Sequence, residues 1–319
     1  MNKTIAIASF WPLPEDVLNK IRQAAPGYDL IDMSKNPTQA QLDQCEIIFG
    51  NVSAQTFANM PNVKWIHAQT AGVEGFLNPA YNLPGHVILT NSSGGYGVSI
   101  AEYMLTGTLM LLRRAKAYIQ QQQQKIWADA GRAYNIYNAQ VLVVGLGDIG
   151  GRYGEICHHL GAKVSGVVRT PRANPPAYID KLYTIDQLDT ALKGADIVAL
   201  ALPGTGDTAG ILSKARMAAM KKGAIIINVG RGTAIDQDGM IQLLQSAHLG
   251  GAALDVMVPE PLPSESPLWT MPNVIITPHI SHGGRDNTAE LVVGKFTQYL
   301  EDYLAGRPFA RVVDKQAGY

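Results

Sequence analysis

Short apolar runs recur along the chain and alternate with segments of amphipathic, helical pattern. The runs are TIAIAS, EIIFG, KWIHA, QVLVVG, KVSGVV, DIVALAL, GAIIINV, GGAALDV and NVIITP. Runs of this length and composition are typical of strands that are buried on both faces, as in parallel sheets. The alternation therefore predicts an α/β protein whose parallel sheets are covered by helices.

The strand pattern occurs both in the first 90 residues and in the middle of the chain. A long helix is expected from about Val98, in VSIAEYMLTGTLMLLRRAKAYI, and a second in RDNTAELVVGKFTQYLEDYLAG, where Gly306 is a suitable stop. This order predicts one domain inserted into another. We expect a first domain of residues 1–97, an inserted domain of residues 98–284, and a return helix and tail, residues 285–319, that pack on the first domain.

Composition and charge narrow the possible partners. The chain has 319 residues and 26 Lys plus Arg against 26 Asp plus Glu, so its formal net charge is zero. Without a positive field we expect no nucleic acid partner. No apolar stretch reaches the roughly 20 residues that span a bilayer, so we expect no membrane partner. Cys45 and Cys157 match neither a zinc nor a disulfide pattern. We therefore expect a cytoplasmic protein without a metal.

A glycine-rich loop, GLGDIG, follows the apolar run QVLVV and precedes a helical segment. In such a loop Gly145 makes the tight turn, Gly147 allows a pyrophosphate to approach, and Gly150 packs the helix on the strand. Asp148 and Ile149 complete the loop, and a second strand follows about 20 residues on. The pattern predicts dinucleotide binding, with a purely structural glycine turn as the alternative.

The second strand of this unit ends in VVRTPR. An acidic residue at this place hydrogen-bonds the ribose 2′-hydroxyl of NAD and repels a 2′-phosphate. Here Arg169, Thr170 and Arg172 stand instead, and a guanidinium is well shaped to bind phosphate. The stretch favours NADP(H) as cofactor, with NAD(H) possible. The alternative is a pair of solvated arginines in a proline-rich turn.

Three further strands end in chemically useful residues. Arg231 follows GAIIINV, Asp255 and Glu260 follow GGAAL, and His279 follows NVIITP. In open α/β sheets, ligands bind at the carboxyl ends of the strands, so these residues are expected at one edge. The guanidinium can bind a carboxylate, and the imidazole can exchange a proton near neutral pH. Taken singly, each residue has a simpler explanation. Arg231 could cap a helix or bind the backbone, Glu260 could be a charge on a loop, and His279 could be a buried core histidine.

Together these segments resemble the D-2-hydroxyacid dehydrogenase family, which includes glyoxylate/hydroxypyruvate reductases and phosphoglycerate dehydrogenases. The resemblance covers nearly the whole chain and rests on VVGLGDIG, LALPGT, INVGRGTAID, AALDVMVPEPLP and ITPHISHG, in the family's order. It implies a Rossmann-type dinucleotide-binding domain inserted into a flavodoxin-like substrate domain. It also implies that Arg231 binds the substrate carboxylate and keto oxygen, that His279 is the acid/base, and that Glu260 is its partner.

The resemblance implies further contacts. The loop TAGVEG resembles the family's substrate-binding loop, which nominates the backbone of Ala71, Gly72 and Val73. Besides the glycine loop, the expected cofactor contacts are Arg169, Thr170, Arg172, Leu202, Pro203, Thr205, Val229, Gly230, Asp255 and His279. Family members are usually homodimers, and residues 120–137 would lie in the dimer contact. His67, His282 and Tyr96 are given no firm role.

The sequence thus predicts an oxidoreductase that transfers a hydride between NADP(H) and a small 2-oxo or 2-hydroxy acid. The expected direction is reduction of glyoxylate, hydroxypyruvate or a related acid. A phosphoglycerate-type dehydrogenase is one alternative. A second is a dinucleotide-sensing interaction protein similar to the corepressors related to this family.

Overall fold

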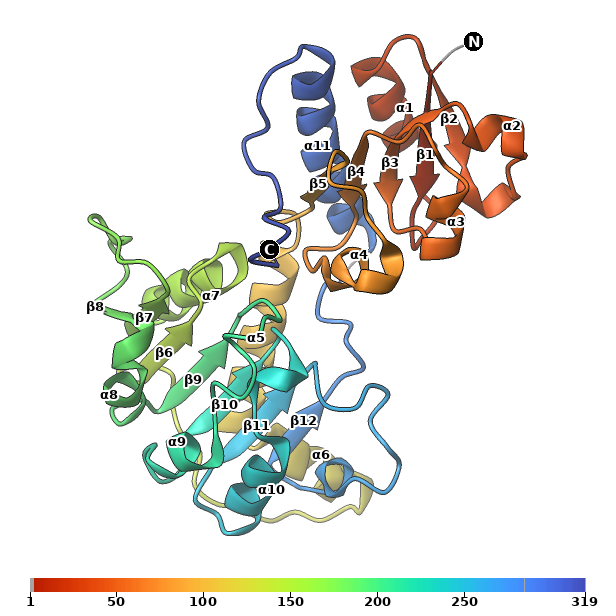
Figure 1. Cartoon of the computed structure of the whole chain (residues 1–319). Coiled ribbons are helices and arrows are strands. Elements are labelled where there is room, and N and C mark those ends of the chain that lie inside the picture. Colours follow the sequence, from red (N-terminus) through yellow and green to blue (C-terminus); the bar gives the residue numbers. More distant parts are fainter. Residues whose placement is uncertain (1–2, 284, 319) are drawn as a thin grey trace. The chain divides into compact units, whose positions relative to one another are not determined.

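The computed structural model describes residues 3–283 and 285–318, without the side chains of residues 285–287. The chain divides into two compact units (Figure 1). Unit 1 consists of residues 1–96 and 284–319, and unit 2 consists of residues 97–283. Both limits of unit 2 differ by one residue from the predicted limits of the inserted segment.

Unit 1 contains a five-stranded parallel sheet in the order β2-β1-β3-β4-β5. Its strands are β1 (Lys3–Ala8), β2 (Tyr28–Asp32), β3 (Cys45–Gly50), β4 (Trp65–Ala68) and β5 (Ile88–Asn91). This is the flavodoxin-like order, in which the direction of winding reverses between β1 and β3. Loops that follow β1 and β3 therefore flank the topological switch point of the sheet.

Helices cover both faces of this sheet. They are α1 (Glu15–Ala24), η1 (Met33–Lys35), α2 (Gln39–Leu42), α3 (Ala54–Ala58), α4 (Glu74–Leu77), η2 (Pro79–Tyr81) and α11 (Arg285–Leu304). Successive side chains of a strand point to opposite faces. Accordingly Ile48 packs with Phe57 and Phe76 on one face, while the ring of Phe49 lies 4.7 Å from that of Phe296 in α11 on the other.

A buried carboxylate ties α11 to the sheet. Glu46 of β3 accepts hydrogen bonds from the hydroxyls of Tyr28 and Tyr303, each 2.9 Å long, and from the amines of Lys3 and Lys64. Burial alone would raise the pKa of Glu46, but the hydrogen bonds outweigh it and lower the pKa to about 2. The return of the chain to unit 1 is therefore fixed by charge as well as by aromatic packing.

Unit 2 contains a seven-stranded parallel sheet in the order β12-β11-β10-β9-β6-β7-β8. Its strands are β6 (Gln140–Val144), β7 (Lys163–Val168), β8 (Lys181–Thr184), β9 (Ile197–Leu200), β10 (Ile225–Asn228), β11 (Gly251–Leu254) and β12 (Val274–Ile276). Counted from β6, this is the Rossmann order with one additional strand, and its switch point lies between β6 and β9.

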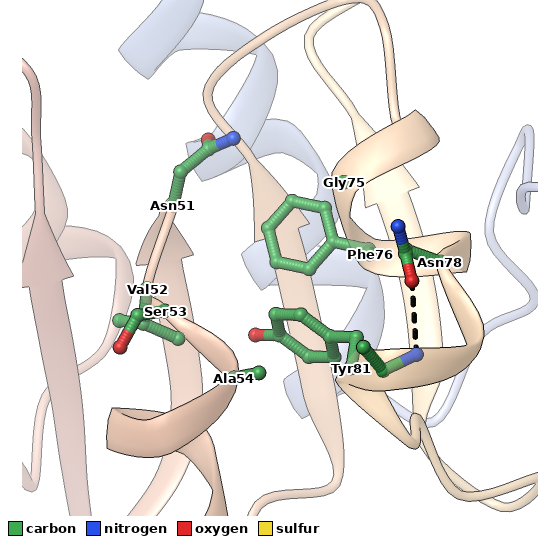
Figure 2. A pocket seen from close by; sticks show the side chains of 9 residues that line it. Asn51, Val52, Ser53, Ala54, Gly75, Phe76, Asn78 and Tyr81 are labelled. Atoms are coloured by element: carbon green, nitrogen blue, oxygen red, sulfur yellow. Dashed lines mark hydrogen bonds between the residues drawn. The ribbon is translucent and has the colours of Figure 1, made fainter.

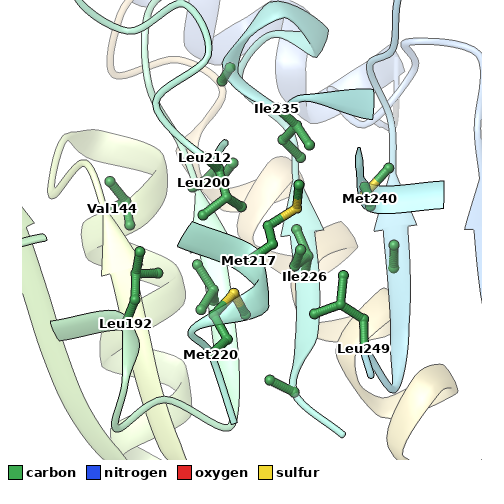
Figure 3. Packing of buried hydrophobic residues seen from close by; sticks show 14 of the residues in the cluster. Val144, Leu192, Leu200, Leu212, Met217, Met220, Ile226, Ile235, Met240 and Leu249 are labelled. Carbon is green, nitrogen blue, oxygen red and sulfur yellow. The ribbon is translucent and has the colours of Figure 1, made fainter. Parts of the chain in front are cut away.

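The helices of unit 2 form two layers. They are α5 (Gly97–Leu112), α6 (Ala115–Gln123), α7 (Asp148–His159), η3 (Ile185–Gln187), α8 (Leu188–Leu192), α9 (Lys214–Ala218), η4 (Gly232–Ala234), α10 (Gln237–Gln245) and η5 (Pro267–Trp269). α5 packs beside α7 and across β10 and β11. Val144, Leu200 and Ile226 face the opposite layer, where Met217 and Met240 join the same core (Figure 3). This alternation leaves the carboxyl ends of the strands for the loops that carry the predicted site.

The helix predicted as one segment from Val98 is divided in two. α5 ends at Leu112, and Arg114 takes a left-handed conformation (φ 55°) before α6 begins. The stretch LLRRAK contains neither Gly nor Pro, so nothing in its residues indicates this break. After it, Nζ of Lys116 donates hydrogen bonds of 2.7 Å to the carbonyls of Met271 and Val274, which anchors the redirected helix.

Candidate active site

The glycine loop joins β6 to α7 in unit 2. Gly145 has a φ of +98°, and a Cβ there would lie 2.6 Å from the carbonyl oxygen of Ala201, so the turn needs glycine. A Cβ at Gly150 would lie 2.0 Å from the carbonyl oxygen of Gly145, which allows α7 to start close to β6. At Gly147 a Cβ would meet nothing within 4 Å among the described residues. The loop therefore fits a pyrophosphate held by the N–H groups that begin α7.

Asp148 and Ile149 form the first turn of α7 and are half-buried. One oxygen of Asp148 accepts a hydrogen bond of 3.0 Å from Nε of Arg152. The other is buried and has no hydrogen-bond partner within the described part of the chain. A Cβ added to Gly97 would lie 2.3 Å from this oxygen, so the carboxylate lies against the start of α5. The backbone N–H of this turn, not the carboxylate, is the group suited to an anion.

The arginines of VVRTPR follow β7 directly. Arg169, Thr170 and Arg172 are all exposed. Nη2 of Arg172 donates a hydrogen bond of 2.9 Å to the carbonyl oxygen of Leu146, inside the glycine loop. The end of β7 is therefore connected to the loop that fits the pyrophosphate, and four of the five N–H donors of this guanidinium remain for other acceptors.

The ends of β9 and β10 approach each other closely. A Cβ at Gly230 would lie 2.7 Å from the carbonyl oxygen of Leu202. The loop after β9 is closed by Thr208, whose hydroxyl donates to the carbonyl of Pro203 and accepts from the N–H of Thr205. Val229 is buried. The predicted contacts on these strands thus line one stretch of the sheet edge, next to the switch point.

Arg231 follows β10 and is half-buried. Its Nη1 donates a hydrogen bond of 2.7 Å to the carbonyl of Gly230, and its own carbonyl accepts one of 3.0 Å from the amide of Asn228. A Cβ at Gly232 would lie 2.3 Å from the backbone of Met257. These contacts hold the backbone around Arg231 against the loop that follows β11.

Glu260 and His279, 19 residues apart in sequence, form an ion pair. Nδ1 of His279 lies 2.9 Å from Oε2 of Glu260, and the two side chains are 48% and 38% exposed. Oε1 of Glu260 accepts a hydrogen bond of 3.0 Å from the N–H of Met257, which orients the carboxylate. The pairing leaves Nε2 of the imidazole as the nitrogen that can exchange a proton with a ligand.

The backbone of His279 is held in a left-handed conformation (φ 54°). Its N–H donates to the carbonyl of Asp255 at 2.9 Å. The carboxylate of Asp255, fully buried, accepts from the N–H groups of Ile280 and Ser281, each at 2.9 Å. Asp255 therefore holds the backbone of residues 279–281, which carries the imidazole of His279.

The hydroxyl of Thr277 extends this network. It donates to Oδ1 of Asp255 at 2.5 Å, and it lies 2.6 Å from the hydroxyl of Tyr103 in α5. Tyr103 is thereby connected to the segment carrying His279, and burial raises the pKa of its hydroxyl to about 12. The left-handed backbone of His279 is strained, and such strain persists only where the surrounding contacts hold the residue in place. The hydrogen bonds that link Asp255, Thr277 and Tyr103 do this.

In unit 1 the loop of residues 71–73 follows β4. The amide of Asn91 donates a hydrogen bond of 2.7 Å to the carbonyl of Ala71, and the hydroxyl of Thr70 donates one of 2.5 Å to the carbonyl of Gly72. Within the described residues, no hydrogen bond takes up the N–H groups of Ala71, Gly72 or Val73. The loop is thus fixed through its carbonyls while its N–H groups are available to an anion.

A cavity of about 320 Å³ in unit 1 is lined by residues of the segments 51–54 and 75–81. Figure 2 shows the rings of Phe76 and Tyr81 between the turn at Asn78 and the segment that starts at Asn51. The predicted site residues do not line it. Where the structure is described, it contains no group of His, Cys, Asp and Glu that could hold a metal ion. No described helix has the length and apolar character needed to cross a membrane.

Comparison with known proteins identifies the family. Residues 105–281 match the family model "D-isomer specific 2-hydroxyacid dehydrogenase, NAD binding domain". The chain belongs to the D-isomer specific 2-hydroxyacid dehydrogenases. A glyoxylate/hydroxypyruvate reductase A from Serratia proteamaculans is 31% identical to it over 273 residues, which cover 83% of this chain and 84% of that protein. This dehydrogenase is therefore an oxidoreductase that acts on the CH–OH group of donors, with a nicotinamide dinucleotide as cofactor.

Solved structures agree with this assignment. A D-isomer specific 2-hydroxyacid dehydrogenase from Xanthobacter autotrophicus, in complex with NADPH and MES, is 27% identical, with a TM-score of 0.85 and full coverage of both chains. An NADPH-dependent glyoxylate/hydroxypyruvate reductase from Sinorhizobium meliloti, in complex with NADP and sulfate, is also 27% identical, with a TM-score of 0.85 and coverage of 99% and 100%. The predicted fold class and family resemblance of the dehydrogenase are thus confirmed.

Sequence reasoning missed two residues of the dehydrogenase that the structure connects to His279. Thr277 lies in the motif ITPHISHG, but only its contacts reveal that it bridges Asp255 and α5. Tyr103 is 174 positions from Thr277, and no spacing rule relates them. Tyr96, which the sequence left without a firm role, is buried, and its hydroxyl donates to the carbonyl of Gln69.

Proposed function

We propose that this dehydrogenase uses NADP(H) to reduce small 2-oxo acids, such as glyoxylate or hydroxypyruvate, to D-2-hydroxy acids. The observation that carries the proposal is the 2.9 Å pair of His279 and Glu260 at the strand edge that also bears Arg231. When bound, the nicotinamide supplies the hydride for the carbonyl carbon. The residues of the chain must then bind the acid, polarise its carbonyl and supply a proton.

Each of the three residues has a distinct task. The guanidinium of Arg231 binds the substrate carboxylate and polarises the neighbouring carbonyl, for which its planar donor fork is suited. Nε2 of His279 donates a proton to the carbonyl oxygen as the alcohol forms. Glu260, held by the N–H of Met257, orients the imidazole through Nδ1. In unit 1, the N–H groups of residues 71–73 are a separate group that is suited to a carboxylate.

The preference for NADP(H) rests on the end of β7. Arg169 and Arg172 stand where an acid would otherwise repel a 2′-phosphate. The hydrogen bond from Arg172 to Leu146 places one of these guanidinium groups beside the glycine loop. Two structural neighbours are described with NADPH or NADP bound. These observations support NADP(H) over NAD(H).

We also propose that the protein is a homodimer, formed through the arm that comprises residues 120–137. Four large apolar side chains of this arm are exposed. They are Ile126, Trp127, Tyr134 and Tyr137, and Trp127 is fully exposed. A cavity of about 700 Å³ lies beside it, lined by residues of α6 and of the arm. Exposed aromatic residues next to a hollow are typical of subunit interfaces.

The two cysteines are free, which is compatible with the cytoplasmic location predicted from the sequence.

The function is tested by measuring oxidation of NADPH with glyoxylate, hydroxypyruvate and longer 2-oxo acids. Wild-type protein should consume NADPH with at least one of them. His279→Ala should lower kcat by about 100-fold or more, because general acid catalysis is lost, while the dissociation constant for NADPH stays unchanged. His159→Ala, an exposed histidine at the end of α7, serves as the control. Turnover equal to wild type in His279→Ala would remove the catalytic assignment.

A further inference from the structure

The loop that joins β7 to β8, residues 169–180, is anchored at its end. It reads RTPRANPPAYID and contains three prolines, which restrict the shapes that its backbone can take. Residues 169–175 are all exposed, whereas Tyr178 is half-buried. The N–H of Asp180 donates to the carbonyl of Val164 at 2.8 Å, and the carboxylate of Asp180 accepts from the N–H of Val164 at 2.7 Å. These bonds hold the end of the loop near the start of β7.

The ring of Tyr178 lies along two glycines of α7. A Cβ added to Gly154 would lie 3.4 Å from Cε2 of this ring, and one added to Gly151 would lie 3.1 Å from its hydroxyl oxygen. Residues three apart on a helix share a face. The ring therefore follows α7 for about one turn, with its hydroxyl toward the amino end of the helix, and the absence of side chains at the two glycines permits this approach.

The contact with Tyr178 explains why a glycine stands at position 151. Glycine destabilises a helix interior relative to alanine. Apart from the chain neighbours of Gly151 and the backbone of the helix, the Tyr178 hydroxyl oxygen is the one described atom that a Cβ would meet within 4 Å. At 3.1 Å it is closer than an ordinary van der Waals contact. An alanine at this position would therefore displace the hydroxyl and nothing else outside the helix.

The same loop brings the guanidinium of Arg172 to this end of α7. Arg172 donates to the carbonyl of Leu146, two residues before the helix begins. Burial raises the pKa of Tyr178, the carboxylate of Glu155 adds to this effect, and the positive charge of Arg172 opposes it. The hydroxyl thus lies within reach of the field of Arg172. The exposed part of the loop is held at two points, on the glycine loop by Arg172 and on the helix by Tyr178.

We propose that Tyr178 is a positioning residue that supports selectivity for a cofactor with a 2′-phosphate. Packed on Gly151 and Gly154, it keeps residues 169–177 folded back on α7, so that the guanidinium of Arg172 stands beside the glycine loop before a cofactor binds. A group that is already in place loses less conformational freedom on binding, which strengthens its contact. All of these residues belong to unit 2. The inference deepens the proposed function and rests on its preference for NADP(H).

The test measures the dissociation constants of NADPH and NADH by isothermal titration calorimetry in wild type, Tyr178→Ala and Tyr178→Phe. Wild type should bind NADPH more tightly than NADH. Tyr178→Ala should weaken NADPH binding about 10-fold, the lower end of the range for losing one hydrogen bond to a charged group, and should leave NADH binding unchanged. Tyr178→Phe should retain most of the preference, because the ring that packs on α7 remains.

Gly151→Ala tests the same contact from the side of the helix. The added methyl group should displace the Tyr178 hydroxyl and weaken NADPH binding. Combining Gly151→Ala with Tyr178→Phe should restore the binding, because the atom that the methyl group meets is then absent. Gly294→Ala is the matched control, since Gly294 lies in α11 and a Cβ there meets no described atom within 4 Å. It should leave both dissociation constants unchanged.

Limited proteolysis gives a readout without cofactor. Trypsin should cleave after Arg172 faster in Tyr178→Ala than in wild type, because the loop opens more often when its anchor is lost. An unchanged ratio of the two dissociation constants in Tyr178→Ala, or an equal loss for NADPH and NADH, would overturn the inference and leave the proposed function intact. A wild type that binds NADH more tightly would overturn the preference for NADP(H) itself.

Thermal unfolding of each variant establishes that folded proteins are compared. If Tyr178→Ala does not fold, Gly151→Ala and its combination with Tyr178→Phe decide the question, because both keep an aromatic ring on α7. Failure of the combined variant to recover NADPH binding would then overturn the inference.

Discussion

At the scale of single residues, the proposed preference for NADP(H) can be tested at the arginines that follow β7. Arg169→Ala should weaken NADPH binding roughly 10- to 150-fold, the range expected for losing one hydrogen bond to a charged group. Binding of NADH should barely change, because it has no 2′-phosphate. Arg169→Asp should go further and prefer NADH, since the acid repels the phosphate and accepts from the ribose hydroxyl. Steady-state KM and kcat for both cofactors measure this.

Lys193→Ala removes another exposed positive charge from unit 2 and should leave both cofactors unaffected. A wild-type preference for NADH, or retention of the NADPH preference in Arg169→Asp, would show that these arginines are surface charges without a role in binding.

Two Tyr→Phe variants distinguish an effect on catalysis from an effect on stability. Tyr103→Phe removes the hydroxyl that lies 2.6 Å from Thr277, and Tyr153→Phe removes one that lies 2.8 Å from Thr108, between α5 and α7. Each should lower the free energy of unfolding by about 1 kcal/mol. Only Tyr103→Phe should also lower kcat, because only its partner belongs to the segment of His279. Equal kcat in the two variants would reduce Tyr103 to a structural role.

The residues that could be predicted from sequence are those that a single strand positions. Glu260 and His279 each follow a buried strand, so the rule on strand ends placed them at one edge before any contact was known. Tyr103 follows no such rule, because its role depends on how α5 packs across the sheet.

At the scale of elements, a buried histidine of β4, which contacts β5, makes the stability of the fold depend on pH. Nδ1 of His67 lies 2.7 Å from the hydroxyl of Thr90 and Nε2 lies 3.1 Å from that of Ser92. Burial lowers the pKa of His67 from 6.5 to about 3. Between about pH 3 and pH 6.5, the imidazole of His67 is therefore protonated in the unfolded chain and neutral in the folded protein. Stability is fully present above pH 6.5 and falls as the pH decreases.

The free energy of unfolding should decrease by up to about 1.4 kcal/mol for each unit by which the pH falls below 6.5. Hydrogen exchange of the amides of β4 between pH 6.5 and 5, where carboxylates remain largely ionised, measures the local free energy of opening. His67→Gln keeps a polar side chain without the titration and should flatten the profile. The same slope in this variant would assign the effect to another group.

Which strands could be predicted depends on how continuous their apolar sequence is. The apolar runs predicted nine strands, and β2, β5 and β8 were not among them. β2 has one buried residue and β8 has none, so their sequences lack a continuous apolar run. β5 is a strand of four residues, ILTN, whose second half is polar. Likewise α5 and α6 appeared as one helix, because tertiary contacts of Lys116, not local propensity, redirect the chain.

At the scale of the whole molecule, the proposed dimer can be tested at the arm of residues 120–137. A buried interface tryptophan typically contributes about 2 kcal/mol or more. Trp127→Ser should therefore raise the dissociation constant of the dimer by about 30-fold or more, at 1.4 kcal/mol per tenfold change. Analytical ultracentrifugation over a concentration series measures it. Leu160→Ser, an exposed position directly after α7 and outside the arm, is the control. A monomeric wild type would refute the proposed dimer.

The division of unit 1 between two distant segments has a consequence during synthesis on the ribosome. Phe296 and Tyr303 of α11 pack on Trp65, at 5.3 and 5.2 Å between ring centroids, and Tyr303 completes the hydrogen bonds of Glu46. About 200 residues are translated between the sheet and this helix, which takes roughly 10–40 s. Through that interval one face of the sheet lacks its cover while unit 2 emerges and can fold. The nascent sheet is therefore the part most exposed to aggregation and to chaperones, and slowing translation within unit 2 should prolong that exposure.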